Sequence, residues 1–112
     1  MSLPLLNRKL TLETAVHTPD MAGGYSTAWQ PLGTLWAEIV AGSGAARGAN
    51  GLALSRVPLR ITVRAAQVGS EARPAAGQRF REGVRIYAIL AVAERDTQAR
   101  FLTCHAEEEV AA

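Results

Sequence analysis

Cysteine and histidine are scarce in this sequence, which has one cysteine and two histidines among its 112 residues. A lone thiol cannot form an internal disulfide, and the chain has no Cys/His cluster with the spacing of metal ligands. Cys104 and His105 are neighbours, but adjacent strand residues point to opposite faces and cannot form a catalytic dyad. We therefore expect a reducing cytoplasm during synthesis, Cys104 as a small core residue, and neither metal nor cofactor.

Long apolar runs are also missing. The longest, Ile86–Ala93, falls well short of the roughly 20 residues that a membrane span needs. The apolar patch at Leu3–Leu6 lacks the basic and then apolar order of a signal peptide. We expect no membrane partner. With 112 residues, the chain is of ordinary size for one domain, and residues 1–112 are expected to form one.

Lysine is nearly absent. Lys9 is the only lysine among 12 basic residues, and with 10 acidic residues the formal charge is +2. That charge is too small to serve by itself as a nucleic-acid footprint. Arginine makes bidentate contacts and is enriched at interfaces, so its excess favours binding to partners. A GC-rich genome, which encodes Arg and Ala more often, is an alternative explanation.

No segment has the period of an amphipathic helix, and the patterns that are present predict strands. Residues 10–16 and 57–66 alternate apolar and polar side chains, as half-buried strands do. Thr34–Val40 carries bulk on both faces, and Val84–Glu94 is almost continuously apolar, which predicts a strand covered on both faces. About five to seven strands predict an all-β fold, a small antiparallel barrel or sandwich.

The remaining segments are expected to be short strands, turns and ends. Pro31 is expected to separate a short strand at 25–29 from the strand at 34–40. A looser strand is expected at 100–106, and residues beyond Glu107 are expected to fray. The connecting segments are expected at Pro19–Gly24, at Gln67–Gln78 with at most one helical turn, and at Arg95–Ala99.

A glycine-rich loop, Gly42–Ser55, follows the second main strand. Short domains seldom keep so long a loop without a use for it. Gly48 is followed by Ala49 and Asn50 rather than Lys and Ser/Thr, and Arg47 stands where a dinucleotide loop needs glycine. Neither phosphate-binding motif is met, so nucleotide binding by this loop is not expected.

Catalytic groups do not form a recognisable constellation, because the glutamates are scattered and expected to be exposed structural carboxylates. We expect no enzyme activity. Trp29 and Trp36 are either stacking platforms for single-stranded nucleic acid or, more simply, core and interface anchors. The arginine row Arg56, Arg60 and Arg64 either contacts DNA backbone, pairs with acids of a neighbouring subunit, or is an ordinary solvated face.

In order, these features resemble the phage head–tail joining family, the stopper or head-completion proteins of long-tailed phages, and the equivalent component of gene transfer agents. The resemblance spans about Arg8 to Glu107. It rests on Arg8-Lys9-x-Thr-Leu-Glu, Asp20-x-x-Gly23-Gly24 before Trp29, Gly33-Thr34-Leu35-Trp36-Ala37-Glu38-Ile39, the glycine loop, Leu59-Arg60-Ile61-Thr62-Val63-Arg64, Arg79-Phe80 and Tyr87-x-Ile89.

The resemblance implies a small β-barrel that forms a homo-oligomeric ring between portal or adaptor and tail, with double-stranded DNA passing non-specifically through the lumen. The protein would be made in the bacterial cytoplasm and incorporated into the particle. The long, flexible loop after the second main strand, residues 42–55, would project toward the channel and plug or line it through Gly42, Ser43, Gly44, Arg47, Gly48, Asn50 and Gly51. Partners would dock on Trp36, Arg56, Arg60, Arg64, Arg79, Arg81, Arg85 and Tyr87. The alternatives are a tail terminator and an oligonucleotide-binding small barrel.

Overall fold

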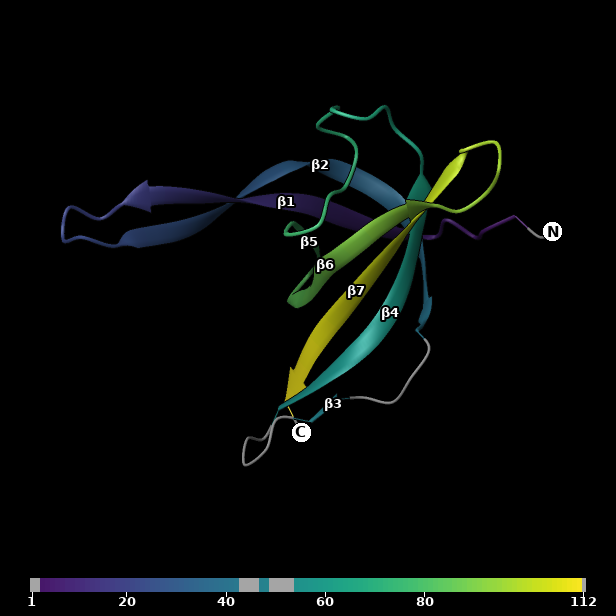
Figure 1. The fold of residues 1–112 in the computed structure, drawn as a ribbon. Coiled ribbons are helices and arrows are strands. Elements are labelled where there is room, and N and C mark those ends of the chain that lie inside the picture. The colour runs from purple at the N-terminus through teal and green to yellow at the C-terminus, as the bar shows by residue number, and fades with distance from the viewer. Residues whose placement is uncertain (1–2, 43–46, 49–53, 112) are drawn as a thin grey trace.

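The computed structural model describes residues 3–42, 47–48 and 54–111, and this part of the chain is entirely β (Figure 1). No helix in the described ranges is long and apolar enough to span a membrane. The described strands are β1 (Arg8–Pro19), β2 (Tyr25–Ala41), β3 (Arg47–Gly48), β4 (Leu54–Arg64), β5 (Arg79–Glu82), β6 (Arg85–Glu94) and β7 (Phe101–Ala111).

The strands form one sheet in the order β2-β1-β5-β6-β7-β4-β3, and β2 also pairs with β4. This last pairing closes six strands into a barrel-like ring, and every pairing is antiparallel. The predicted all-β antiparallel class is therefore confirmed. The core inside the ring consists of Leu10, Leu12, Ala37, Ile61, Val63, Phe80, Tyr87, Ile89, Leu102, Cys104 and Ala106.

β2 differs from the prediction, because it continues for 17 residues through Pro31 instead of breaking there. The register between β1 and β2 shifts at this point: Leu12 pairs with Gly33, and Glu13 pairs with Pro31. Leu32 is thus an extra residue, and a bulge is one of the few places where a strand tolerates proline. Gly33 has φ of 148°, which explains why glycine follows the bulge.

β6 is covered on one face only, so the prediction of two covered faces is wrong for the single chain. Tyr87 and Ile89 point into the core, whereas Ile86 and Leu90 are 38% and 52% exposed. The continuous apolar run therefore gives β6 one face that packs inside the ring and one that no described residue of the chain covers.

One further expectation, at the end of the last strand, is corrected, whereas the expected connection at Gln67–Gln78 is confirmed. Residues beyond Glu107 do not fray directly, since β7 continues to Ala111 and pairs with the start of β4. The connection between β4 and β5 forms only turns, with a backbone hydrogen bond from Arg73 to Ser70, and Pro74 after it is buried. The strand β5, which the sequence pattern did not reveal, follows this connection.

The β1–β2 hairpin extends beyond the ring as an arm, residues 14–30 (Figure 1). Within this arm each strand pairs only with the other, because β1 pairs with β5 at residues 11–13 and β2 pairs with β4 at residues 37–41. The predicted turn closes it: the Asp20 carboxylate accepts hydrogen bonds from the backbone N–H groups of Ala22 and Gly24. The molecule is accordingly elongated, about 51 by 34 by 23 Å.

Candidate interface surfaces

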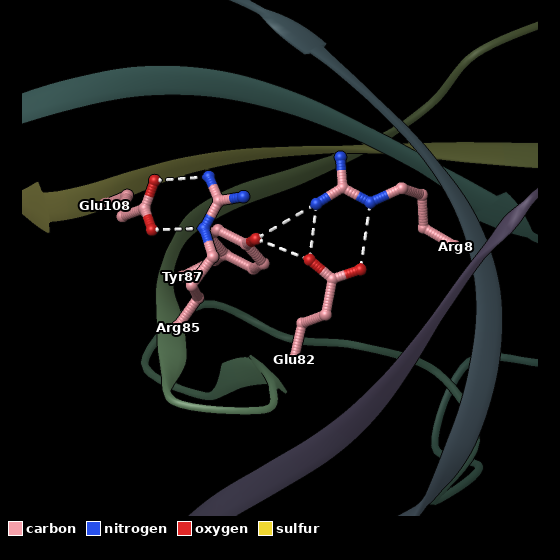
Figure 2. A network of polar contacts seen from close by, with 5 residues as sticks. All are labelled: Arg8, Glu82, Arg85, Tyr87 and Glu108. Atoms are coloured by element: carbon pink, nitrogen blue, oxygen red, sulfur yellow. Dashed lines mark hydrogen bonds and ion pairs between the residues drawn. The ribbon is translucent and has the colours of Figure 1, made fainter.

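Tyr87 lies at the centre of a polar network rather than on the outer surface where it was expected (Figure 2). Its side chain is fully buried, so the expectation of an exposed Tyr87 is wrong. The phenol donates a 2.9 Å hydrogen bond to the carboxylate of Glu82, which also pairs with the Arg8 guanidinium. Burial, helped by this hydrogen bond, raises the pKa of Tyr87 to about 12.

The same network holds together strands that are far apart in sequence. Arg8 comes from β1, Glu82 from β5 and Tyr87 from β6. Arg8 Nε donates to Glu82 at 2.8 Å, and this bond holds the pKa of the Glu82 carboxyl below its usual 4.5. Because β5 lies between β1 and β6, the network fastens three neighbouring strands at one end of the ring.

Arg85 is committed to an ion pair within the chain. Its Nε and Nη2 donate to the two carboxylate oxygens of Glu108 at 2.8 and 2.9 Å. The pair raises the pKa of Arg85 and lowers that of Glu108. It joins β6 to β7 beside Tyr87, as Figure 2 shows. The Arg85 side chain is still 50% exposed, so docking of a partner at this residue stays a prediction.

Arg79 and Arg81 converge on one buried carboxylate, Glu13. The Glu13 oxygens lie 2.7 Å from Arg79 Nε and 3.1 Å from Arg81 Nε, and the glutamate is 4% exposed. The expectation that Glu13 is an exposed carboxylate is therefore wrong. Arg79 also lies over the ring of Trp29, 4.1 Å from its centre. Trp29 is half-buried and serves as an anchor for this cluster.

The β4 arginines form an outward row, as the alternating pattern predicts, since Ile61 and Val63 between them are buried. Arg56 lies 3.7 Å from Glu109 in an exposed pair. Arg64 lies 5.9 Å from the centre of the Phe101 ring. For Arg60, the described part of the chain offers neither an ion pair nor a ring contact. Arg60 is the member of the row most available to a partner.

Trp36 is 56% exposed on the outer face of β2, where a partner can reach it. Of the predicted loop, the structure describes Gly42 and the backbone of Arg47, Gly48, Leu54 and Ser55, whereas Ser43, Gly44, Asn50 and Gly51 lie outside the described residues. The predicted end of the loop is corrected, because β4 already begins at Leu54. Gly42 donates its backbone N–H to Pro58, and a Cβ there would lie 3.1 Å from the Pro58 carbonyl carbon. Arg47 and Gly48 pair with the beginning of β4 as β3.

Sequence reasoning missed the partners of these arginines. Glu13, Glu82 and Glu108 look like isolated surface acids along the chain, and their partners lie 66, 74 and 23 residues away. One feature of the sequence does indicate the β5–β6 hairpin, namely the glycine in Glu82-Gly83-Val84-Arg85. A tight turn needs a residue with positive φ, and Gly83 has φ of 61°. No three His, Cys, Asp or Glu side chains gather as a metal site would require within the described ranges.

Comparison with known proteins gives one consistent result. A family model described as phage head completion protein matches residues 1–109. A solved structure of the virion of a native gene transfer agent (GTA) particle contains a similar chain, with 54% sequence identity and a TM-score of 0.87. The alignment covers 98% of this chain and 100% of that one. A search of curated proteins finds no significant match.

Proposed function

The chain belongs to the phage head completion protein family, and we propose that it is a stopper, a structural connector subunit at the head–tail joint of a phage-like particle. Copies form a ring between portal or adaptor and tail, retain packaged DNA and attach the tail. The observation that carries this proposal is the 54% identity, over 98% of the chain, to a chain in a GTA virion. The role is structural and requires no catalytic residue.

The ion pairs between strands support a structural role for this protein. Arg8, Arg79 and Arg85 are tied to glutamates of other strands, which brace a small ring. What remains outside, above all Trp36 and Arg60, is available for neighbouring subunits.

The predicted loop, residues 42–55, supplies the part that faces the DNA channel, and its last two residues, Leu54 and Ser55, begin β4. Its small residues let several copies crowd near an axis, and Arg47 is its only charged residue. Repeated around a ring, one arginine per subunit forms a positive collar that contacts phosphates without reading bases. β3 holds the Arg47 backbone against β4 and so gives the loop a fixed point within its length.

Two alternatives remain, and the observations favour them less. Loss of a tail terminator of the same joint would leave heads that still retain DNA. An oligonucleotide-binding barrel that stacks bases on both tryptophans would need two accessible rings, whereas only Trp36 is exposed and Trp29 is half-buried beneath Arg79. A flat titration of single-stranded DNA against the isolated protein would remove that alternative.

The test is electron microscopy of particles made without this protein. The stopper role predicts heads that lack tails and leak their DNA, and re-expression of the wild-type chain should restore filled, tailed particles. DNA-retaining heads beside unattached tails would instead identify a terminator. Normal particles would overturn both roles.

A further inference from the structure

The β1–β2 arm, residues 14–30, is nearly without charge (Figure 1). Asp20 is its only Asp, Glu, Lys or Arg residue, although 20% of the whole chain is charged. Its exposed apolar side chains are Val16 at 38%, Tyr25 at 73% and Met21 at 99%. A ribbon of two strands is only marginally stable in water, and few charges beside exposed Tyr and Met are typical of a surface that an interface buries. The arm thus has the composition of an interface element.

Met21 lies in the turn that closes the arm, and almost its whole surface is exposed. Hydrogen bonds hold this turn: the Asp20 carboxylate accepts from the backbone N–H groups of Ala22 and Gly24, and the Asp20 N–H donates to the Gly24 carbonyl at 3.1 Å. Met21 has φ of 64°, which residues other than glycine seldom adopt. The turn therefore uses the Asp20 carboxylate internally and presents an apolar side chain at the tip of the arm.

An apolar pocket lies at the other end of the arm, beside the β-bulge. We call it the bulge pocket and define it by Leu12, Leu32, Gly33, Leu35 and Ala72. Leu12 belongs to the core, and Leu32 and Leu35 pack against the core, so the pocket opens onto its edge. The volume is about 230 Å³, which is room for a whole side chain rather than for one water molecule. Thr34 and Glu71 complete the lining, and both are exposed, so the Glu71 carboxylate can stay in water when the pocket is filled.

The tip of the arm cannot reach the bulge pocket of its own chain. The ribbon between them is roughly 23 Å long, at about 3.3 Å per residue from Glu13 to Asp20. Strand pairing is continuous along this length, up to Pro19 with Tyr25, so the arm does not fold back on itself. A protruding apolar side chain and an apolar pocket at two separate places on one chain allow a head-to-tail contact between copies, the kind that closes rings.

We propose that the arm of one copy reaches its neighbour in the ring and inserts Met21 into the neighbour's bulge pocket. Methionine suits such a pocket, because its unbranched side chain adapts to irregular apolar space. The contact depends on apolar burial and not on charge, since neither the arm nor the lining of the pocket contains Lys or Arg. The inference rests on the proposed ring-forming function and names the two surfaces that meet.

A disulfide experiment tests the contact in assembled particles. The double variant Met21→Cys/Ala72→Cys places one thiol at the tip of the arm and one at the pocket. The native Cys104 will not compete, because it is fully buried and burial raises its pKa to about 12. Particles carrying the variant are oxidised, unfolded and separated on a non-reducing gel. The controls are each single variant and Met21→Cys/Gln98→Cys, whose second thiol lies on an exposed turn that does not line the pocket.

A ladder of covalent multimers in Met21→Cys/Ala72→Cys, with monomers in all three controls, is the expected result. Dimers of Met21→Cys alone would show that two tips meet, and a product with a different particle protein would show that the tip binds that protein; either would overturn the proposal. A double variant that enters particles but stays monomeric would overturn this contact while leaving the stopper role intact. Absence of the wild-type protein from particles would instead overturn the proposed function.

Filling the pocket gives a second, independent readout. Ala72→Trp should occupy the bulge pocket and lose tailed particles. Ala76→Trp makes the same change at an exposed position of the β4–β5 connection that does not line the pocket, and it should assemble normally. On the other surface, Met21→Asp should lose tailed particles and Met21→Leu should keep them. Because all these positions are exposed, the four variants should share the wild-type urea midpoint. Normal particles from Ala72→Trp or Met21→Asp, or equal loss from Ala76→Trp, would contradict the contact.

Discussion

Arg79 lies over Trp29, with its guanidinium carbon 4.1 Å from the ring centre, while its Nε donates to the buried Glu13 at 2.7 Å. One arginine thus joins the bulged end of the β1–β2 hairpin to the short strand β5. Several arginines of this chain therefore have a structural role, because they form ion pairs with glutamates of other strands. These pairs also keep the net charge low although arginine is abundant. It also marks the place where the arm leaves the ring.

The first prediction concerns that tie. Glu13→Gln removes the carboxylate that neutralises Arg79 and Arg81, of which Arg79 has a side chain only 16% exposed. Because breaking a buried ion pair leaves an uncompensated charge, the free energy of unfolding should fall by about 3 kcal/mol. Urea denaturation measures it. Glu71→Gln, on an exposed turn, is the control and should unfold with the wild type; equal midpoints for Glu13→Gln and wild type would contradict the assignment.

Acid stability provides the second prediction. The pKa of Glu82 and that of Glu108 are both held below the usual 4.5 by arginine partners. The unfolded chain therefore binds protons at a higher pH than the folded one, so this stabilisation is present above about pH 4.5 and is lost as pH falls through the folded pKa values. Urea midpoints between pH 3 and pH 7, in steps of roughly half a unit, should show the decline.

The matched variants isolate those two carboxylates. Glu82→Gln/Glu108→Gln should be less stable than the wild type at neutral pH and should lose less on acidification. Glu71→Gln/Glu94→Gln, which changes two exposed glutamates, should keep the wild-type acid dependence. If the two double variants respond to acid alike, the network in Figure 2 is not the source of the effect.

Tyr87 gives the third prediction. Tyr87→Phe removes a buried hydroxyl that donates to a carboxylate, so the free energy of unfolding should fall by about 1.5 kcal/mol. The difference in alkaline absorbance between wild type and variant isolates this phenol and should show a midpoint near its pKa of about 12. A midpoint near the ordinary value of 10.0 would mean that the hydroxyl is exposed.

Local patterns in the sequence were enough to place most strands. The alternation from Leu59 to Ala65 gave the correct inner and outer faces, because a period of two is a property of neighbouring residues. Cys104 was placed correctly in the core for the same kind of reason. The residues of β6 are almost all apolar and do not alternate with polar ones, so the sequence does not show which face is buried. For this reason the sequence-based prediction places Tyr87 on the wrong face.

Contacts between distant segments could not be read from the sequence. Glu13 and Arg79 meet only because β1 pairs with β5, and β5 is four residues long with no distinct pattern. The sequence predicts a break at Pro31, because the bulge that accommodates this proline depends on the register with β1. The residues beyond Glu107 pair with the start of β4, which is far away in the sequence. The sequence alone does not reveal this pairing, so it predicts a frayed end.

The last prediction concerns Arg47, the only charged residue of the proposed channel loop. If a ring of these arginines faces DNA phosphates, Arg47→Glu should give tailed particles that lose packaged DNA, since the collar would then repel phosphate. Arg47→Lys keeps the charge and should retain DNA, which separates charge from damage to β3. The measurement is the fraction of DNA-filled particles by electron microscopy, with Arg64→Glu as a charge-matched control. Full retention by Arg47→Glu would show that the loop does not act on DNA through this residue.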